Sequence, residues 1–321
     1  MKTANARALP MASLERRLLA GEFLGHVLLV VLLLGAGVHW PVAIAVAISL
    51  ALAGRAGYVA FSRTLARTLD DRPAPRTGLA AGLRAGVGEW LALTFTHSVL
   101  QPFCAGLLLR CRWPSPGDRD EPAVVLVHGY CATATYWLPM FLRLRRRGLA
   151  VVPPPTLEPA FGGIDEQADA LGAHLRDVRA RYPGRPVVLV GHSMGGLTAR
   201  ACLAAGGGDA VIGMVTLGTP HGGTRLARFG PGKNARQMRP GSAWLAELER
   251  VAPPGALPLT AVAASHDELV SPWRSALPAG ACAHRIVPSG HLALGWQRAS
   301  ADAVSEAVSA ARRRPESPSP R

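Results

Sequence analysis

The sequence lacks the cysteine pattern of a disulfide-stabilised or zinc-binding protein. It has 5 cysteines among 321 residues, which is an odd number, and no two of them stand in C-x-x-C spacing. They lie scattered at positions 104, 111, 131, 202 and 282. Such spacing gives neither a disulfide framework nor a set of thiolate ligands. We therefore expect no structural metal, and no pattern of residues indicates a cofactor.

Acidic residues are also scarce, since 21 Asp and Glu stand against 35 Lys and Arg, a formal net charge of +14. A basic excess attracts nucleic acid or anionic lipid, unless the arginines are merely solvated. Aromatic residues make up only 6 % of the chain, and no basic stripe carries them interleaved. Because no nucleic-acid-binding motif accompanies the charge, we expect no nucleic-acid partner. Attraction to an anionic membrane surface is the better functional interpretation.

No Asp, Glu, Lys or Arg occurs from Phe23 to Gly54. One helix over this run would be about 48 Å long at 1.5 Å per residue, against a hydrocarbon core of about 30 Å. A Trp-Pro pair at 40–41 interrupts the run, since proline disfavours a continuing helix and tryptophan favours the interface. The sequence therefore predicts two membrane spans, at about 19–38 and 42–61. Glu22 and Arg55 would reach the interface from their ends.

A cleaved signal peptide is the alternative, but the apolar run continues too far and no small-residue cleavage site ends it. Arginines flank the hairpin on both sides, so the positive-inside rule predicts a multi-pass protein whose remaining chain lies in the cytoplasm. The stretch from Trp90 to Leu109 is free of charge as well. It either packs as a helix under the following domain or spans the membrane, which would move that domain to the opposite side.

The apolar run VVLV at 187–190 leads directly into GHSMG at 191–195, and a helical segment follows. This is the strand–turn–helix context in which a G-x-S-x-G motif carries a nucleophilic serine. The glycines remove Cβ atoms where the chain reverses, so the hydroxyl of Ser193 stands clear of the sheet edge in a strained turn. We therefore predict that Ser193 is a catalytic nucleophile.

A second strand-like run, AVVLV at 123–127, ends in His-Gly-Tyr at 128–130. An acyl-transfer serine needs two backbone N–H groups directed at the oxygen that becomes negative. One comes from the residue after the nucleophile, Met194, and the other from a loop after an earlier strand, here Tyr130. These two residues are the predicted oxyanion hole. A plain turn that ends the strand is the alternative interpretation.

The acid and the base are expected after the serine, in the chain order Ser, acid, His. Asp267 is the first carboxylate past a strand-like run, and His291 follows another. Both therefore lie at carboxyl ends of strands, where the catalytic groups of open α/β sheets gather. They are the predicted acid and base. Glu268 is the rival acid, and His284, near the start of its strand, is the rival base.

Residues 121–313 resemble the α/β-hydrolase superfamily, and look most like its bacterial lipase and esterase branch. The motifs that carry the resemblance are LVHGY at 126–130, VGHSMGG at 190–196, LGTPHGGT at 217–224, RQMRPGSAWLAEL at 236–248, SHDELV at 265–270 and SGH at 289–291. The TLGTPHGG segment is similar to one in triacylglycerol lipase-like proteins and in the α/β domain of inositol-deacylases. The HGY motif departs from the Gly-Gly-Gly-X oxyanion motif of hormone-sensitive-lipase-like enzymes, so the resemblance does not imply their short-chain specificity.

The resemblance implies an α/β-hydrolase fold, in which helices cover both faces of a mostly parallel sheet. The expected parts are a membrane hairpin at 1–70, a linker with an amphipathic or membrane-associated helix at 71–120, the catalytic domain at 121–313 and a disordered tail at 314–321. A lid-like insertion is expected at about 221–258. Its amphipathic piece, 244–248, would either cover the site or pack as a plain helix.

The predicted function is that of a membrane-anchored serine esterase or lipase in the bacterial inner membrane. It would cleave carboxylic esters, with lipids as the expected substrates, through a Ser-His-Asp triad and an acyl-enzyme. A serine nucleophile disfavours epoxide hydrolases and dehalogenases, which use aspartate, and polyester synthases, which use cysteine. An acyltransferase or a non-catalytic binding member of the same fold is the alternative. A complete triad favours the hydrolase, because a binding protein needs no such set.

Overall fold

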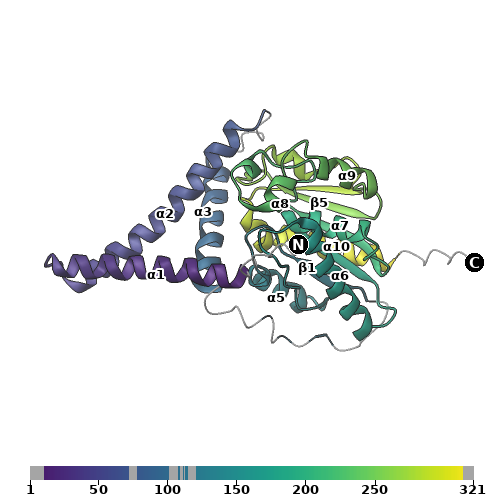
Figure 1. The fold of residues 1–321 in the computed structure, drawn as a ribbon, viewed down its shortest axis with the longest axis horizontal. Coiled ribbons are helices and arrows are strands. Elements are labelled where there is room, and N and C mark those ends of the chain that lie inside the picture. The colour runs from purple at the N-terminus through teal and green to yellow at the C-terminus, as the bar shows by residue number, and fades with distance from the viewer. Residues whose placement is uncertain are drawn as a thin grey trace, which may run out of the picture.

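The structure is a computed structural model that describes residues 11–71, 78–100, 108, 111, 113–114 and 121–313. The predicted tail at 314–321 and most of the chain between 101 and 120 lie outside the described residues. Two parts are seen: a set of long helices from the start of the chain, and an α/β domain against which they lean (Figure 1).

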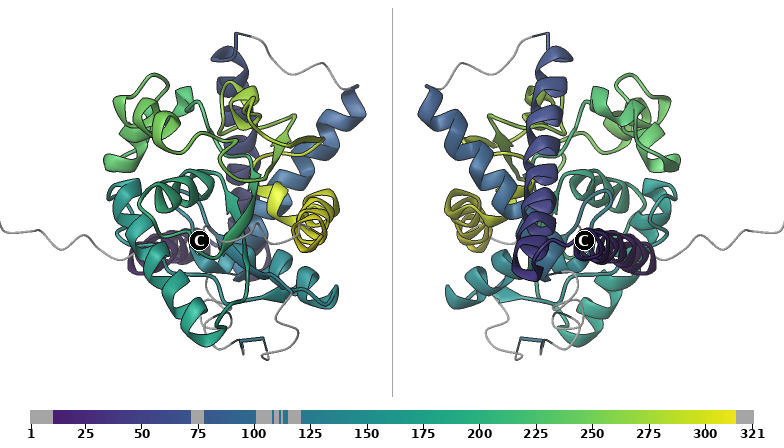
Figure 2. Two further views of the ribbon diagram at one scale, coloured as in Figure 1. Left: turned by 90° about the vertical axis from the view of Figure 1, so that its right-hand side faces the viewer. Right: turned by 90° about the vertical axis from the view of Figure 1, so that its left-hand side faces the viewer.

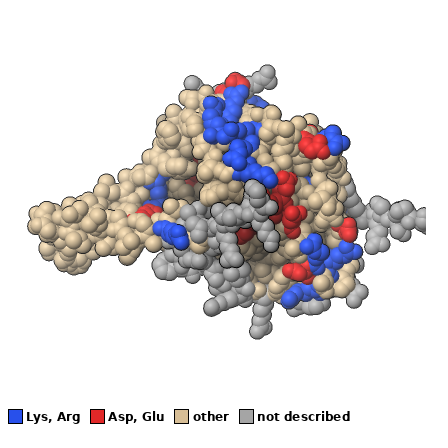
Figure 3. Space-filling model, viewed as in Figure 1, with Lys and Arg blue, Asp and Glu red and all other residues tan. Residues whose placement is uncertain are grey.

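The first two helices, α1 (Met11–Gly35) and α2 (Trp40–Thr68), form a hairpin. Their break, at 36–39, lies directly before the predicted Trp-Pro pair, and Pro41 occupies the first turn of α2, where it removes no intrahelical hydrogen bond. Large apolar side chains are exposed along both helices, including Leu18 at 63 %, Phe23 at 67 % and Phe61 at 67 %. Water is a poor solvent for such a surface, and the protruding end of the hairpin carries no charged side chain on the face seen in Figure 3.

Glu22 and Arg55 do not reach outward separately from the hairpin. They form an ion pair with each other across α1 and α2, with 2.6 Å between the carboxylate and the guanidinium. The antiparallel arrangement brings the middle of α1 beside the middle of α2, so the two charges meet. Pairing lowers the cost of charged side chains at an apolar helix surface.

A third helix, α3 (Leu79–Phe95), continues through a π-helical turn at Thr96–Leu100. It lies between α2 and the α/β domain (Figures 1 and 2). The Trp90 indole donates to the carbonyl of Leu52 at 3.0 Å, and the Arg63 guanidinium donates to the carbonyl of Gly82 at 3.2 Å. These two hydrogen bonds join α3 to α2, and the opposite side of α3 packs on the α/β domain.

The α/β domain is built on a six-stranded sheet with the order β2-β1-β3-β4-β5-β6. Every neighbouring pair is parallel. The strands are β1 (Ala123–Val127), β2 (Ala150–Val151), β3 (Val187–His192), β4 (Val211–Leu217), β5 (Leu259–Ala264) and β6 (Ala283–Val287). All carboxyl ends therefore meet at one edge of the sheet, which is where parallel α/β proteins place their functional groups.

Helices cover both faces of this sheet. Alternate residues of β1 explain the division, since Val125 packs with the core that contains α6 (Ile164–Arg181) and α7 (Met194–Ala204). Leu126 points the other way, into the core that contains α5 (Leu138–Arg146) and α10 (Arg298–Arg312). A strand buried on both faces reads as a continuous apolar run rather than an alternating one. The predicted α/β-hydrolase fold is confirmed.

The long connection between β4 and β5 holds a 3₁₀ turn at Arg225–Arg228, α8 (Gly232–Gln237) and α9 (Ala243–Val251). In α9 the side chains of Leu245 and Leu248 are buried in the core shared with α6 and α7. The Trp244 indole donates to Asp165 at 2.7 Å. The amphipathic piece of the insertion thus packs its apolar face on the domain.

We expect Gly195→Ala to destabilise the domain. A Cβ at this position would lie 2.2 Å from the carbonyl oxygen of Val127 and 2.6 Å from that of His128, and both are backbone atoms that cannot move without separating α7 from β1. Overpacking of this kind costs about 1–3 kcal/mol or more, so thermal unfolding should shift down by several degrees, at about 2–4 °C per kcal/mol.

Gly213→Ala is the matched control, because its Cβ would meet only the carbonyl of Pro258 at 3.6 Å, an ordinary contact. Equal unfolding temperatures for the two variants would show that the close approach of α7 to β1 is not a constraint.

Candidate active site

Ser193 occupies the turn between β3 and α7. Its backbone angles are φ 54° and ψ −129°, so it is one of two non-glycine residues with positive φ among the described residues. The other is Cys131, just after the predicted oxyanion loop. A side chain in this region is strained, and such strain persists only where surrounding contacts hold it. Here the Ser193 N–H donates to the carbonyl of Leu217 at 2.8 Å, which ties the turn to the end of β4.

The loop after β1 lies directly against this turn. A Cβ on Gly129 would stand 2.8 Å from Cβ of Ser193 and 3.4 Å from the backbone nitrogen of Met194. The amide of Tyr130 follows at once, and Met194 is the first residue of α7, where N–H groups have no intrahelical acceptor. The residue before Tyr130 thus lies in contact with the serine, and Met194 follows the serine directly in the chain. The hydroxyl of Tyr130 donates to the carbonyl of Pro231 at 2.7 Å, so its side chain joins this loop to the insertion.

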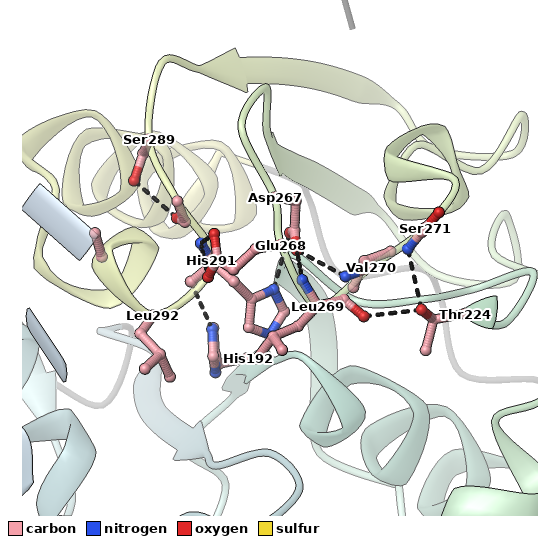
Figure 4. Close-up of polar contacts among 12 residues, drawn as sticks. His192, Thr224, Asp267, Glu268, Leu269, Val270, Ser271, Ser289, His291 and Leu292 are labelled. Atoms are coloured by element: carbon pink, nitrogen blue, oxygen red, sulfur yellow. Dashed lines mark hydrogen bonds and ion pairs between the residues drawn. The ribbon is translucent and has the colours of Figure 1, made fainter. Parts of the chain in front are cut away.

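Asp267 and His291 are brought together from the ends of β5 and β6. The Nδ1 of His291 donates to Oδ2 of Asp267 at 2.8 Å, and both side chains are 1 % exposed. The other carboxylate oxygen accepts the N–H groups of Leu269 at 2.9 Å and Val270 at 2.7 Å (Figure 4). Three hydrogen bonds therefore fix the carboxylate, and the carboxylate in turn fixes the orientation of the imidazole ring.

His291 also lies beside the residues that carry Ser193. The ring of His192 is 4.7 Å from the ring of His291, and its Nε2 is 3.1 Å from the His291 carbonyl oxygen. A Cβ on Gly218, the residue after β4, would stand 3.1 Å from Nδ1 of His291. The Nε2 of His291 is buried and has no hydrogen-bond partner within the described part of the chain. The atom that a general base would use is thus left available.

The electrostatics favour a protonatable imidazole. Burial alone would lower the pKa of His291, but the adjacent Asp267 carboxylate outweighs it and raises the pKa above its ordinary value. His192 differs, because burial and the neighbouring His291 hold its pKa well below the usual range. The ring of His192 stacks on Tyr136 at 4.5 Å between centroids, which makes it a neutral packing residue.

The rival acid and base lie elsewhere. Glu268 is 1 % exposed, but its carboxyl group accepts the backbone N–H of His291 at 3.1 and 3.3 Å rather than a ring nitrogen. His284 is exposed near the start of β6, and its Nε2 is 2.8 Å from the carbonyl oxygen of Pro278. His221 is bonded to Thr216 and Arg200, and burial lowers its pKa to about 3.

One residue near the site was missed from the sequence. Glu89 of α3 is 1 % exposed, and its carboxylate bonds to the backbone immediately after His291. The charge-free stretch that the sequence draws attention to begins at Trp90, one residue later. A single carboxylate inside an apolar helical region was the available signal, because a buried charge needs partners.

A cavity of about 1080 Å³ opens between α2, α3 and the loop that carries Asp267. Its walls include Val59, Leu83 and Val87, with Arg63 among the polar groups. The acid side of the site therefore faces the N-terminal helices. Within the described part of the chain, no group of three or more His, Cys, Asp or Glu is arranged to hold a metal ion.

Comparison with known proteins identifies the domain. A profile of the alpha/beta hydrolase family matches residues 124–318, more than half of the chain. Two curated relatives are 34 % identical over 113 residues, the triacylglycerol lipases of Pseudarthrobacter phenanthrenivorans and Burkholderia plantarii. The match covers 33 % of this chain and 35 % and 31 % of theirs, so the chain spans about a third of the length of these relatives. The crystal structure of the mature Bacillus licheniformis lipase BlEst2 superposes with a TM-score of 0.51 at 17 % identity, over 60 % of this chain and 93 % of that one.

We expect Asp267→Asn to lower the pKa of His291. Without the carboxylate, burial becomes the dominant influence and disfavours the charged imidazole. In the wild type the folded state holds the proton more tightly than the unfolded state, so the proton-linked stability is present below the ordinary pKa of about 6.5 and is lost as pH rises through the raised value. An NMR titration of the His291 ring in detergent-solubilised protein measures this, and an unchanged pKa in the variant would contradict the assigned ion pair.

Proposed function

The chain belongs to the alpha/beta hydrolase family, and on that premise we propose that it is a membrane-anchored serine hydrolase that cleaves carboxylic esters of lipids. The observation that supports this most is the buried Asp267–His291 pair beside a serine held in a strained turn. A packing role alone would not require this combination of strain, burial and an imidazole nitrogen left without a partner among the described residues.

In the proposed mechanism, Oγ of Ser193 attacks the ester carbonyl while Nε2 of His291 accepts its proton. Asp267 holds the Nδ1–H tautomer and stabilises the imidazolium that forms. The oxygen of the tetrahedral intermediate becomes negative and accepts hydrogen bonds from the backbone amides of Met194 and Tyr130. The imidazolium then protonates the leaving alcohol, and water, deprotonated by the same imidazole, hydrolyses the acyl-enzyme.

A lipid substrate is supported by two independent features. Both curated relatives are named triacylglycerol lipases. In addition, the cavity of about 1080 Å³ beside Asp267 is lined mainly by the apolar faces of α2 and α3, which fits an acyl chain.

Membrane anchorage through α1 and α2 is part of the proposal. Residues Arg17–Gly35 and Trp40–Thr68 are 19 and 29 residues long with mean hydropathies of 2.2 and 1.8, enough to cross a bilayer. Core helices and signal sequences share this composition. In the most apolar stretch of each helix, however, 0 % of the first and 17 % of the second is buried, which disfavours a role as core helices. The Ser271 hydroxyl donates to the carbonyl of Ala66 at 3.0 Å, which ties α2 to the catalytic domain and disfavours a cleaved signal.

The proposed location is a bacterial inner membrane, with the catalytic domain in the cytoplasm. Arginines before and near the start of α1, and at the end of α2 and beyond it, favour that side for both flanks of the hairpin. Because α3 is bonded to both α2 and the catalytic domain, the model of a helix that packs under the domain is preferred to a third span.

We expect Ser193→Ala to abolish hydrolysis of p-nitrophenyl esters and labelling by a fluorophosphonate probe. His291→Ala should cost a similar amount, on the order of 10⁴-fold or more, because the members of a triad act as a unit. His284→Ala is the matched control and should stay close to wild type, since its ring is exposed and bonded to Pro278. Undiminished labelling of folded Ser193→Ala would rule out the assignment.

We expect the full-length protein to remain in the membrane pellet after alkaline carbonate washing. Reporter fusions after Asp71 and after Arg313 should both report cytoplasm, and a fusion after Gly37, in the hairpin turn, should report the opposite side. The reason is that α1 and α2 each cross once and the chain returns. Release by carbonate would refute the hairpin, and opposite reports after Asp71 and Arg313 would mean that a further segment spans.

A further inference from the structure

Glu89 reaches from α3 into the loop that carries the proposed catalytic histidine. Its Oε1 accepts the N–H of Leu292 and its Oε2 the N–H of Ala293, each at 2.9 Å. Both amides belong to the first turn of the 3₁₀ segment Leu292–Trp296, which starts directly after His291. First-turn N–H groups have no acceptor of their own, and a carboxylate there is favourable.

Gly290 makes this approach possible. A Cβ on Gly290 would stand 2.4 Å from Oε2 of Glu89 and 2.8 Å from its Cβ. The glycine of the Ser-Gly-His motif is therefore required by a side chain that arrives from about two hundred positions earlier in the chain. The side chain of Glu89 on α3 therefore packs directly against the backbone of Gly290 in the histidine loop.

Glu268 holds the preceding amide, that of His291, so the carboxyl groups of Glu268 and Glu89 lie on neighbouring N–H groups of the same turn. Two glutamates thus bind three consecutive N–H groups, at 291, 292 and 293. Two buried carboxyl groups this close to each other repel when both are ionised, and one shared proton removes that repulsion. Burial and the adjacent Glu89 raise the pKa of Glu268, which makes Glu268 the protonated member. Glu89 accepts one backbone N–H group on each of its two oxygens.

The surroundings of the pair are mixed in charge. Arg63 of α2 attracts both carboxyl groups, while Asp267, the neighbour of Glu268 in the chain, repels Glu268. The other ionisable groups close enough to interact are Tyr58 of α2, Tyr136 of the turn before α5, and the His291 ring. One net negative charge beside one arginine is tolerable in such a site, whereas two adjacent carboxylates next to Asp267 would repel one another strongly.

We propose that Glu89 is a positioning residue for the catalytic histidine, and that it acts with Glu268 as a pair of carboxyl groups that share one proton. This rests on the proposed function, since positioning matters only if His291 is the base. The helix α3 is then a working part of the active site and not only a spacer after the membrane hairpin. Displacing it from the domain would move the imidazole relative to Ser193.

The substitutions Glu268→Gln and Glu89→Gln distinguish the members of the pair. Glu268→Gln reproduces a protonated glutamic acid: its amide oxygen accepts the His291 N–H and its NH₂ donates to Glu89. This variant should lose less kcat at neutral pH than Glu89→Gln, because it keeps the hydrogen bond to the His291 N–H. Glu89→Gln turns an NH₂ group toward one of two backbone N–H groups and removes the negative charge. The histidine loop should then shift and misplace the imidazole, which should lower kcat by about 10- to 100-fold. KM should change little, because no substrate contact is lost.

A pH profile separates positioning from a merely structural role. In the wild type, alkaline pH removes the shared proton, the two carboxylates repel each other, and kcat should fall. Glu268→Gln has no such proton to lose, so its alkaline limb should be absent or lie at higher pH. Normalising kcat to the fraction of sites titrated by the fluorophosphonate probe removes differences in the amount of folded protein. A purely structural role would change that fraction and leave the profile unaltered.

All measurements use the full-length, detergent-solubilised protein. Glu247→Gln is the matched control, because Glu247 is an exposed carboxylate paired only with Arg250 and should change neither kcat nor the profile. Should Glu89→Gln fail to fold, Glu89→Asp retains the charge but is one methylene shorter, so it cannot reach both amides and should show the same loss of kcat. If neither Glu89 variant folds, the alkaline limb of Glu268→Gln decides.

Two results would overturn the proposal: a folded Glu89→Gln with wild-type kcat, or an alkaline limb that Glu268→Gln leaves in place. A wild type that neither turns over esters nor reacts with the probe would instead refute the proposed function. The shared proton is then tested by unfolding alone. Because the folded state keeps the Glu268 proton, stability should decline as pH rises from about 4.3 through the raised pKa, and Glu268→Gln should remove that decline.

Discussion

A parallel sheet forces the chain to return to the same edge after every strand, and the rest of this molecule follows from that constraint. The loop with Gly129 leaves β1, Ser193 leaves β3, Asp267 leaves β5 and His291 leaves β6. The helices that cover both faces fix the strands in register, so groups separated by up to 162 positions, from Gly129 to His291, are brought within contact of the same turn. The polar groups meet there because the sheet interior is filled mainly by apolar side chains.

Bringing carboxyl groups to a buried edge has a cost, and the structure offsets it with hydrogen bonds. Asp267 accepts three bonds, and the Glu89–Glu268 pair accepts the N–H groups of three successive residues. Charges that are desolvated without such partners destabilise a fold by several kcal/mol. The loop after β6 is held from two directions, by the imidazole–aspartate bond and by the glutamates behind its backbone. These two attachments would keep the imidazole in one orientation, as a base that takes up and returns a proton requires.

The N-terminal helices differ in the surroundings that their surfaces favour. α1 and the first part of α2 expose large apolar side chains, which an aqueous environment would penalise and a bilayer would accept. α3 buries a carboxylate against the α/β domain, which a lipid-facing helix could not do. Contacts of Ala66 and Asp70 with the loop around Ser271 and Trp273 extend this attachment to the end of α2. In the proposed arrangement, the active site is therefore built onto the membrane anchor and not suspended from it by a flexible linker.

The sequence by itself determined what depends on neighbours along the chain. The apolar runs gave the strands, the glycines around Ser193 gave the turn, and the charge-free stretch with Trp40 and Pro41 gave the hairpin and its break. The order of groups after successive strands was enough to select Ser193, Asp267 and His291 as candidates. Only the tertiary structure decided which neighbouring carboxylate, Asp267 or Glu268, faces the imidazole, because adjacent residues in a loop can turn either way. It also decided that Glu22 pairs with Arg55 and that Glu89 supports the histidine loop. No local pattern in the sequence indicates which distant segment a charged side chain will contact.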